Sequence, residues 1–282
     1  MALVGSYVAL SKPLVAVFGV YLLAWARFGI GAIAMAGWAR PLPGTPAMRA
    51  SQWLWVFALS LFGNVLFSVF MLNGVQRTSA STAGVIMASL PAVVAILSAW
   101  LLKERLSTRA ALAIGLAVIA IAVFASEQPD TQASQWLGNL LIFAAVCCEA
   151  MYVVIAKKLA GDLSAKRMSA LINRWGLLMM TPLALGPMLD FSLEAVPPSS
   201  WALLLFYGLA ASVWTVVLWV RGLQTIPAHQ AGVFTVMLPI SATVVGVVFL
   251  GEELTGLQTV AMGVALMGVV LITTSSRGHL TK

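Results

Sequence analysis

Long apolar runs, separated by short breaks rich in charge, proline or glycine, fill almost the whole chain. Apolar runs of about 17 to 25 residues can cross a bilayer as helices, which satisfy their own backbone hydrogen bonds there. The pattern predicts ten such helices, the first of which is expected to be short at its amino end. They lie near residues 1–15, 20–39, 51–73, 79–102, 108–125, 135–158, 166–189, 199–220, 228–250 and 255–274.

One segment of this pattern occurs twice. The stretch GVQRTSASTAGVIMASLP, residues 74–91, returns 148 residues later without a gap as GLQTIPAHQAGVFTVMLP, residues 222–239. We therefore expect a first five-helix repeat over 1–127, a linker over 128–134 and a second repeat over 135–282. Because five is an odd number, the second repeat is expected to be inverted relative to the first, around a central cavity.

Composition agrees with this all-α integral membrane architecture. The chain is 61% hydrophobic and 9% charged, with a mean hydropathy of +0.99, whereas soluble domains are about 25% charged. The breaks between the runs are short, so the pattern leaves no room for a soluble domain.

The basic residues predict the orientation, because cytoplasmic loops of membrane proteins are rich in Lys and Arg. An inside amino end places one basic loop residue, Arg77, outside. The inside then holds Arg40, Arg49, Lys103, Arg105, Arg109, Lys157, Lys158, Lys166, Arg167, Arg221, Arg277 and Lys282. We expect a multi-pass protein of the bacterial inner membrane with both termini in the cytoplasm. Cations spread over several short loops on one membrane face do not suit nucleic acid, so no nucleic-acid partner is expected.

Two prolines occupy the same position in the two copies. Pro91 and Pro239 lie near the centres of the fourth and ninth predicted helices, and each leaves the carbonyl four residues before it without a partner. Those carbonyls belong to Met87 and Thr235. They are predicted to line the central cavity, with the prolines as hinges; the alternative is two static kinks in close-packed helices.

Glu149 is the single carboxylate inside a predicted span. A charge at the bilayer centre is costly, so Glu149 is expected to face protein or water. Two roles are open for Glu149. It binds substrate or a coupling proton, or it is a neutral carboxyl group that hydrogen-bonds to a neighbouring helix. Arg27 and its repeat partner Arg174 lie nearer the ends of their helices. Snorkelling to the headgroups is expected for both, and pairing with a loop or with a substrate carboxylate is the alternative.

The deeper aromatic residues are candidate walls of a substrate site, although residues that face lipid would give the same pattern. They are Tyr7, Tyr152, Trp175 and Trp214, of which Tyr7 and Tyr152 are repeat partners. Walls of this kind favour neutral, zwitterionic or apolar solutes. Asn64, in the third predicted helix, needs a polar partner, which is either substrate or another helix.

Several of these elements together resemble the drug/metabolite transporter superfamily. They are Ala26-Arg27-Phe28, Ser89-Leu90-Pro91, Leu102-Lys103-Glu104-Arg105-Leu106 and Gly251-Glu252-Glu253-Leu254 within the five-plus-five repeat. The most similar subgroup is the EamA-type exporters, and within it the bacterial amino-acid exporters, one for aromatic amino acids among them. The resemblance implies export of amino acids and related metabolites by alternating access, through a monomer that needs no cofactor or metal.

Other functions have less support. His229 and His279 form no metal-binding or hydrolytic motif, so an enzyme is not expected. A channel needs a ring of charges or exposed carbonyls along a pore, and one acid with two isolated prolines does not supply it. Export of drugs, nucleotide sugars or lipids stays open as an alternative within the superfamily.

Overall fold

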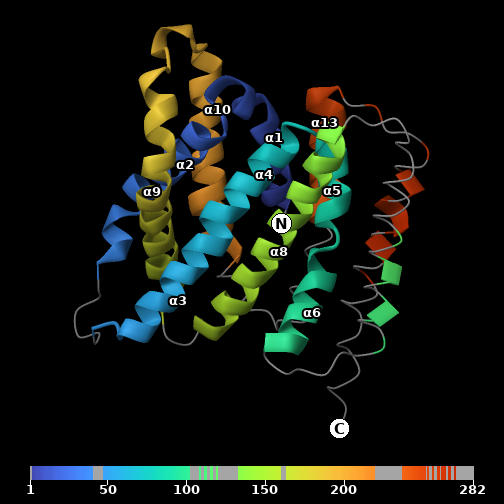
Figure 1. Cartoon of the computed structure of the whole chain (residues 1–282), viewed down its shortest axis with the longest axis horizontal. Helices are drawn as coiled ribbons and strands as arrows, with labels where there is room; N and C mark the ends of the chain where they lie inside the picture. The colour runs from blue at the N-terminus through green and yellow to red at the C-terminus, as the bar shows by residue number, and fades with distance from the viewer. Residues whose placement is uncertain are drawn as a thin grey trace.

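In a computed structural model of the protein, all the regular structure described is helical (Figure 1). The structure describes residues 2–40, 47–101, 133–159, 163–219 and 237–251, with scattered residues in 108–119 and 253–270. Most of the predicted helix 108–125, the start of 228–250 and most of 255–274 lie outside this set, so ten helices and their inverted arrangement stay predictions.

The helices follow the apolar runs closely. In chain order they are α1 (Ala2–Phe18), α2 (Val20–Ala34), the 3-10 turn η1 (Ala36–Ala39), α3 (Ala50–Ser60), the π-helical turn η2 (Leu61–Leu66), α4 (Phe67–Val75), α5 (Ala80–Met87), α6 (Leu90–Leu101), α8 (Ala133–Leu159), α9 (Ala165–Leu189), the 3-10 turn η3 (Leu193–Ala195), α10 (Pro198–Leu209), the π-helical turn η4 (Ala210–Trp214) and α13 (Met237–Leu250).

Among the described residues, four helices are long and apolar enough to cross a membrane: Ala50–Val75, Thr82–Leu101, Gln135–Ala156 and Pro198–Trp219. Helix α9 is 25 residues long but is not one of these four. Its first ten residues include Lys166, Arg167, Asn173 and Arg174, which lower its hydropathy. The structure thus confirms at least four of the predicted spans by length and composition.

The first two predicted helices meet at one residue, Gly19. Helices α1 and α2 are long and apolar enough to cross a membrane only when they are counted as one span. They are bent by 117° relative to each other. Gly19 has a φ of 70°, a conformation that glycine adopts without the steric cost of a Cβ atom. The predicted second helix ends earlier than expected, because α2 stops at Ala34 and a 3-10 turn follows.

The third helix of each predicted repeat contains a π-helical turn. In the first copy, η2 joins α3 and α4 into one continuous span, and in the second, η4 continues α10. Residues 62–66 correspond to 210–214 at the repeat offset of 148, so the two π turns fall in the same place. Such turns are rare and are frequent at functional sites.

The fourth predicted helix is broken just before Pro91. The chain leaves the α-helical pattern at Ala88 and Ser89, where the N–H of Ser89 donates to the Ile86 carbonyl over 3.0 Å. The Ser89 hydroxyl donates to the same carbonyl over 2.7 Å. Pro91 has no N–H to donate to the Met87 carbonyl and its ring crowds that carbonyl, which accounts for a break in the turn before Pro91.

The two halves of the chain are interleaved. Helix α1 packs along α13, and α8 packs along α5 and α6, so the first helix of each half lies on the fourth helix of the other half. In the same way α2 packs on α10 and α9 packs on α3, while α2 and α9 pack on each other (Figure 1). Asn64 Nδ2 donates to the Ile172 carbonyl over 3.0 Å, and the Ser212 hydroxyl donates to the Arg27 carbonyl over 3.4 Å.

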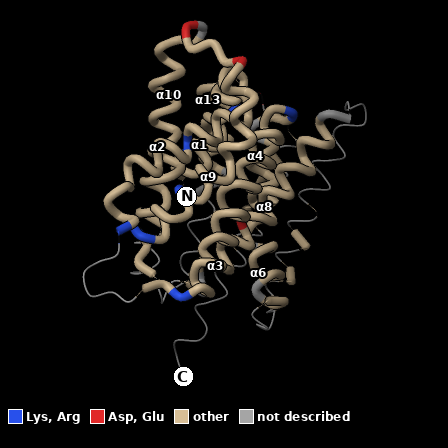
Figure 2. The backbone as a smooth tube through the Cα atoms, turned by 60° about the vertical axis from the view of Figure 1, so that its left-hand side comes forward, with Lys and Arg blue, Asp and Glu red and all other residues tan. Residues whose placement is uncertain are grey.

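Helix α9 has basic residues at one end and acidic residues at the other. Figure 2 shows acidic residues at the upper tip of the molecule and several basic residues at its lower side. Lys166 Nζ lies 5.3 Å from the ring centroid of Trp38, at the end where α9 begins. Asp190 and Glu194 lie in the connection after α9, about 37 Å away at the rise of an α-helix. Cations at the amino end and an anion at the carboxyl end of α9 both oppose the helix dipole, so helix stability does not account for their placement.

Candidate functional site

Arg27 is buried in the protein, with 4% of its side chain exposed. Its Nη2 donates to the Ser68 hydroxyl of α4 over 2.8 Å, and its Cζ lies 4.4 Å from the centroid of the Phe28 ring. Its Nε is buried and has no hydrogen-bond partner in the described parts of the chain. The expectation that Arg27 snorkels to the headgroups is wrong, because a partner on α4 holds the guanidinium inside. Arg174 instead donates to the Ala36 carbonyl over 3.2 Å in an exposed contact.

Close packing against α9 fixes the segment of α2 that carries Arg27. A Cβ atom on Gly31 would lie 2.8 Å from Asn173 Oδ1 and 2.7 Å from Ser212 Cβ. On α9, a Cβ atom on Gly176 would lie 3.2 Å from the ring of Phe28. Small residues at these contacts let the backbones approach, as they do in membrane helix pairs. The position of Arg27 is therefore set by both halves of the chain.

Glu149 on α8 is partly buried and faces this arginine. Arg27 is the charged group that acts on its carboxylate through space, and the carboxylate in turn acts on Tyr7 and Tyr152. Within the described part of the chain, Glu149 makes no side-chain hydrogen bond and no ion pair with Arg27. The two opposite charges lie near each other without direct contact.

Three tyrosines surround the charged pair. The rings of Tyr7 and Tyr207 meet edge to face, with centroids 5.8 Å apart. The ring of Tyr152 lies directly against Gly63 in the π turn η2, where a Cβ atom would overlap it. Tyr7, Arg27, Glu149, Tyr152 and Tyr207 are called the central cluster below. It draws on α1, α2, α8 and α10 and therefore on both halves of the chain.

The structure brings together three of the residues predicted for the site, Tyr7, Glu149 and Tyr152. Sequence reasoning missed Tyr207 and assigned Arg27 to the membrane surface. Tyr207 lies nine residues after Pro198, well inside an apolar helix. That depth was a usable signal, because a buried tyrosine hydroxyl normally has a polar partner.

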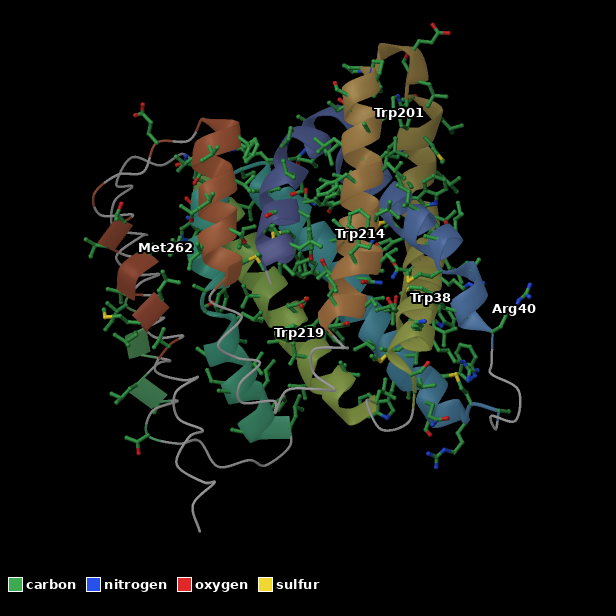
Figure 3. All side chains as sticks on the ribbon, turned by 180° about the vertical axis from the view of Figure 1, so that it is seen from behind. Trp38, Arg40, Trp201, Trp214, Trp219 and Met262 are labelled. Atoms are coloured by element: carbon green, nitrogen blue, oxygen red, sulfur yellow. The ribbon has the colours of Figure 1, made fainter. Side chains whose placement is uncertain are left out.

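The other predicted site residues lie elsewhere. Asn64 bonds the backbone of α9, so of its two predicted partners the structure shows the helix. Trp175 contacts Phe57 edge to face, with centroids 5.3 Å apart, and packs against the same apolar cluster as Tyr152. Trp214 is 42% exposed and packs on Phe206, and its place in a cavity wall stays a prediction. Figure 3 labels Trp214 on its helix.

The predicted hinge residues are described only in part. Met87 is buried at the end of α5, directly before the break at Pro91. Pro239 is the third residue of α13, and the chain before that helix lies outside the described residues. Thr235 lies outside them as well. Among the residues that the structure does describe, no group of His, Cys, Asp or Glu has the arrangement of a metal site.

Comparison with known proteins identifies the family. The chain matches the EamA-like transporter family over residues 1–126 and 136–274. The chain belongs to the EamA-like transporter family. It is 31% identical over 273 residues to the uncharacterized transporter YetK of Bacillus subtilis (strain 168), covering 95% of this chain and 83% of YetK.

More distant matches extend this EamA-like relationship. An uncharacterized transporter of Archaeoglobus fulgidus is 25% identical over 220 residues, covering 77% of this chain and 76% of its own. A crystal structure of a protein that is 20% identical aligns over 97% of this chain and 93% of its own, with a TM-score of 0.64. That likeness shows a shared fold. The more specific resemblance to the bacterial aromatic amino-acid exporter YddG stays a prediction.

The family decides the class of function. The family and the relatives are named as transporters, and not as enzymes. This protein is therefore a transporter in a membrane, and a transporter of this kind acts on a small-molecule substrate.

Proposed function

We propose that this protein is a secondary transporter that exports amino acids, neutral and aromatic ones among them, across the bacterial inner membrane. The observation that carries the proposal is the central cluster, which places two opposite charges and three tyrosines where helices from both halves meet. Small-molecule sites are mostly apolar or aromatic with a few placed polar groups, and transporters built from two repeats bind substrate at the repeat interface.

Alternating access is the proposed mechanism. Helices from opposite halves pack on each other, so a rocking of one half against the other would shift α1 relative to α13, and α8 relative to α5 and α6. The break before Pro91 in the α5–α6 span is the proposed bending point of the first half, and Pro239 is its proposed counterpart. A charged pair at the interface between halves would then face each side of the membrane in turn.

The charges at the ends of the described helices support the proposed orientation. Arg40 and Arg49 lie between η1 and α3, Lys166 and Arg167 lie at the start of α9, and Asp190 and Glu194 lie at the opposite end of α9. The basic end is proposed to face the cytoplasm. The two stretches that match the family, with paired π turns, support the proposal of two inverted repeats.

Counterflow in proteoliposomes tests the function. Vesicles preloaded with unlabelled L-phenylalanine, L-leucine or L-threonine should accumulate the labelled amino acid, because a carrier exchanges substrate across its two conformations. A channel would dissipate the gradient without accumulation. Absence of exchange for all proteinogenic amino acids, with exchange of a nucleotide sugar or a cationic drug, would overturn the proposed substrate class while leaving a transporter.

A further inference from the structure

Arg27 holds unused hydrogen-bonding capacity in the interior of the protein. A guanidinium carries five N–H donors and cannot lose its proton, yet among the residues that the structure describes this side chain makes one donation, from Nη2 to Ser68. Its Nε is buried and finds no acceptor within the same set of residues. A buried charge that lacks partners is strongly unfavourable, so such charges in membrane proteins mark pathways and binding sites.

Glu149 does not complete the pair. Its carboxylate acts on Arg27 through space, but within the described residues no ion pair forms between them and no hydrogen bond reaches the carboxylate. Both side chains are held from opposite sides of the interface, Arg27 on α2 of the first half and Glu149 on α8 of the second. Each charge therefore lacks a close counter-ion, and the two are of opposite sign.

The backbone around each charge is fixed. The contacts of Gly31 and Gly176 hold α2 against α9, and the contact of Gly63 with Tyr152 holds α8 against η2 three residues beyond Glu149. In this conformation these contacts set the positions of the two helix segments that carry the charges.

An α-amino acid is the small molecule that carries the complement of this pair. Its carboxylate suits the planar donors of a guanidinium, which bind carboxylates in a bidentate manner. Its ammonium group suits the Glu149 carboxylate and the faces of the neighbouring tyrosine rings, because aromatic faces attract cations. The edge-to-face pair of Tyr7 and Tyr207 adds an apolar wall for a neutral or aromatic side chain.

We infer that Arg27 and Glu149 form a zwitterion site, in which Arg27 binds the substrate carboxylate and Glu149 binds its ammonium group. The inference rests on the proposed function and adds the two recognition residues and a selectivity rule to it. A substrate that lacks either charge leaves one side chain unpaired, and sites built to pair a polar group strongly reject analogues that lack it.

The test compares three compounds that share one side chain: L-phenylalanine, phenethylamine without the carboxylate, and 3-phenylpropionate without the amine. Counterflow is measured for each in proteoliposomes that contain the full chain. Wild-type protein should exchange L-phenylalanine at least about tenfold faster than either analogue, the size expected for loss of a charged hydrogen bond. An equal rate for all three compounds would overturn the inference.

Two variants separate the two roles. Arg27→Gln should reduce the preference for L-phenylalanine over phenethylamine towards equality, and Glu149→Gln should do the same for the preference over 3-phenylpropionate. These ratios are independent of how much protein folds, because all three compounds are measured on one preparation. Arg27→Lys, which keeps the charge but not the planar donors, should lower the L-phenylalanine rate and retain part of the preference.

Arg174→Gln is the matched control. Arg174 is the repeat partner of Arg27, is exposed and donates to a backbone carbonyl at the helix end, so its loss should leave both ratios unchanged. Unchanged ratios in Arg27→Gln and Glu149→Gln, with L-phenylalanine still exchanged, would overturn the zwitterion site and leave the proposed function standing. Wild-type protein that exchanges no amino acid but another solute would overturn the proposed function itself.

Discussion

Two arginines that correspond in the predicted repeats have different surroundings. Arg27 and Arg174 are each followed by an aromatic residue and a glycine, yet one is buried and the other is exposed. Ser68 gives Arg27 an acceptor inside the protein, whereas Arg174 lies beside the carbonyl of Ala36. The proposed site therefore uses the arginine of the first repeat alone.

The pH dependence of transport is expected to depend on Glu149. The groups that interact with it among the described residues are Arg27, Tyr7, Tyr152 and Cys148. Protonation neutralises the carboxylate and removes its attraction for ammonium, so wild-type exchange should fall as pH is lowered. Glu149→Gln should be slower and constant within about twofold across the same range, because the group that titrates is gone. Initial rates of counterflow at stepped pH values measure this.

A Glu149→Gln variant that keeps the wild-type rate and pH profile would contradict that prediction. Arg174→Gln is a suitable control, since Arg174 lies outside the central cluster and should show the wild-type profile.

The sequence predicted part of this site, and the other part depends on contacts that the sequence does not show. Tyr7 and Tyr152 could be found because repeat pairing and depth in a helix are both visible in the sequence. The burial of Arg27 could not, because it depends on the approach of α2 to α9 and on Ser68, 41 residues later. The role of Trp214 could not be decided from the sequence, because in an apolar helix the lipid face and the cavity face carry the same residue types.

At the scale of the helices, two departures from regular α structure are close to the site. The π turn η2 carries Gly63, against which Tyr152 lies, and the break before Pro91 lies in the adjoining α5–α6 span. The break was predictable, since proline cannot donate to the carbonyl four residues before it. The π turn was not, because one extra residue in a helical turn leaves no mark in an apolar sequence.

Gly63→Ala should impair transport. The added methyl group overlaps the Tyr152 ring, so Tyr152 must leave its position in the central cluster. We expect the exchange rate to fall about tenfold or more, which corresponds to about 1.4 kcal/mol in the barrier. Counterflow with L-phenylalanine measures the rate, and size-exclusion chromatography confirms folding.

Gly37→Ala is the control for that variant, because a Cβ atom on Gly37 meets nothing within 4 Å. Equal rates in the two variants would show that the position of Tyr152 does not matter for transport.

Pro91→Ala should slow the change between conformations. Alanine restores an N–H that can donate to the Met87 carbonyl, which favours a continuous helix across the break at Ala88 and Ser89. Steady exchange should therefore decrease while equilibrium binding of L-phenylalanine is kept. Calorimetric binding and counterflow on one preparation separate these effects.

Pro182→Ala provides the comparison, since Pro182 lies inside α9, which continues without a break. A Pro91→Ala variant with wild-type exchange would show that the break is a static kink.

For the whole molecule, the distribution of charge predicts topology. Cysteine at Asp190 should react with a membrane-impermeant maleimide added to cells with a permeabilised outer membrane, because Asp190 follows α9 at the acidic end. Cysteine at Arg40 should react only after the inner membrane is opened. The background carries Cys147→Ala and Cys148→Ala, which remove both native thiols. Labelling of Arg40→Cys in unopened cells would contradict the orientation.

Local sequence patterns determine some features of the overall arrangement, and contacts between distant segments determine others. Length and hydropathy predicted the helices themselves, and repeat spacing predicted which of them correspond. The sharp joint at Gly19 and the exchange of helices between halves depend on contacts between distant segments, which no single stretch of sequence contains.

The bond from Asn64 to the Ile172 carbonyl also bears on how the chain is made. Its two partners are 108 residues apart in the sequence, and several helices lie between them. At synthesis rates of about 5–20 residues per second, the donor waits roughly 5 to 20 seconds before its acceptor leaves the ribosome. During that interval the amide, and the hydroxyl of Ser60 that shares this acceptor, must be satisfied by water, by neighbouring chain or by the insertion machinery. Nascent chains arrested before residue 172 should therefore remain dependent on that machinery.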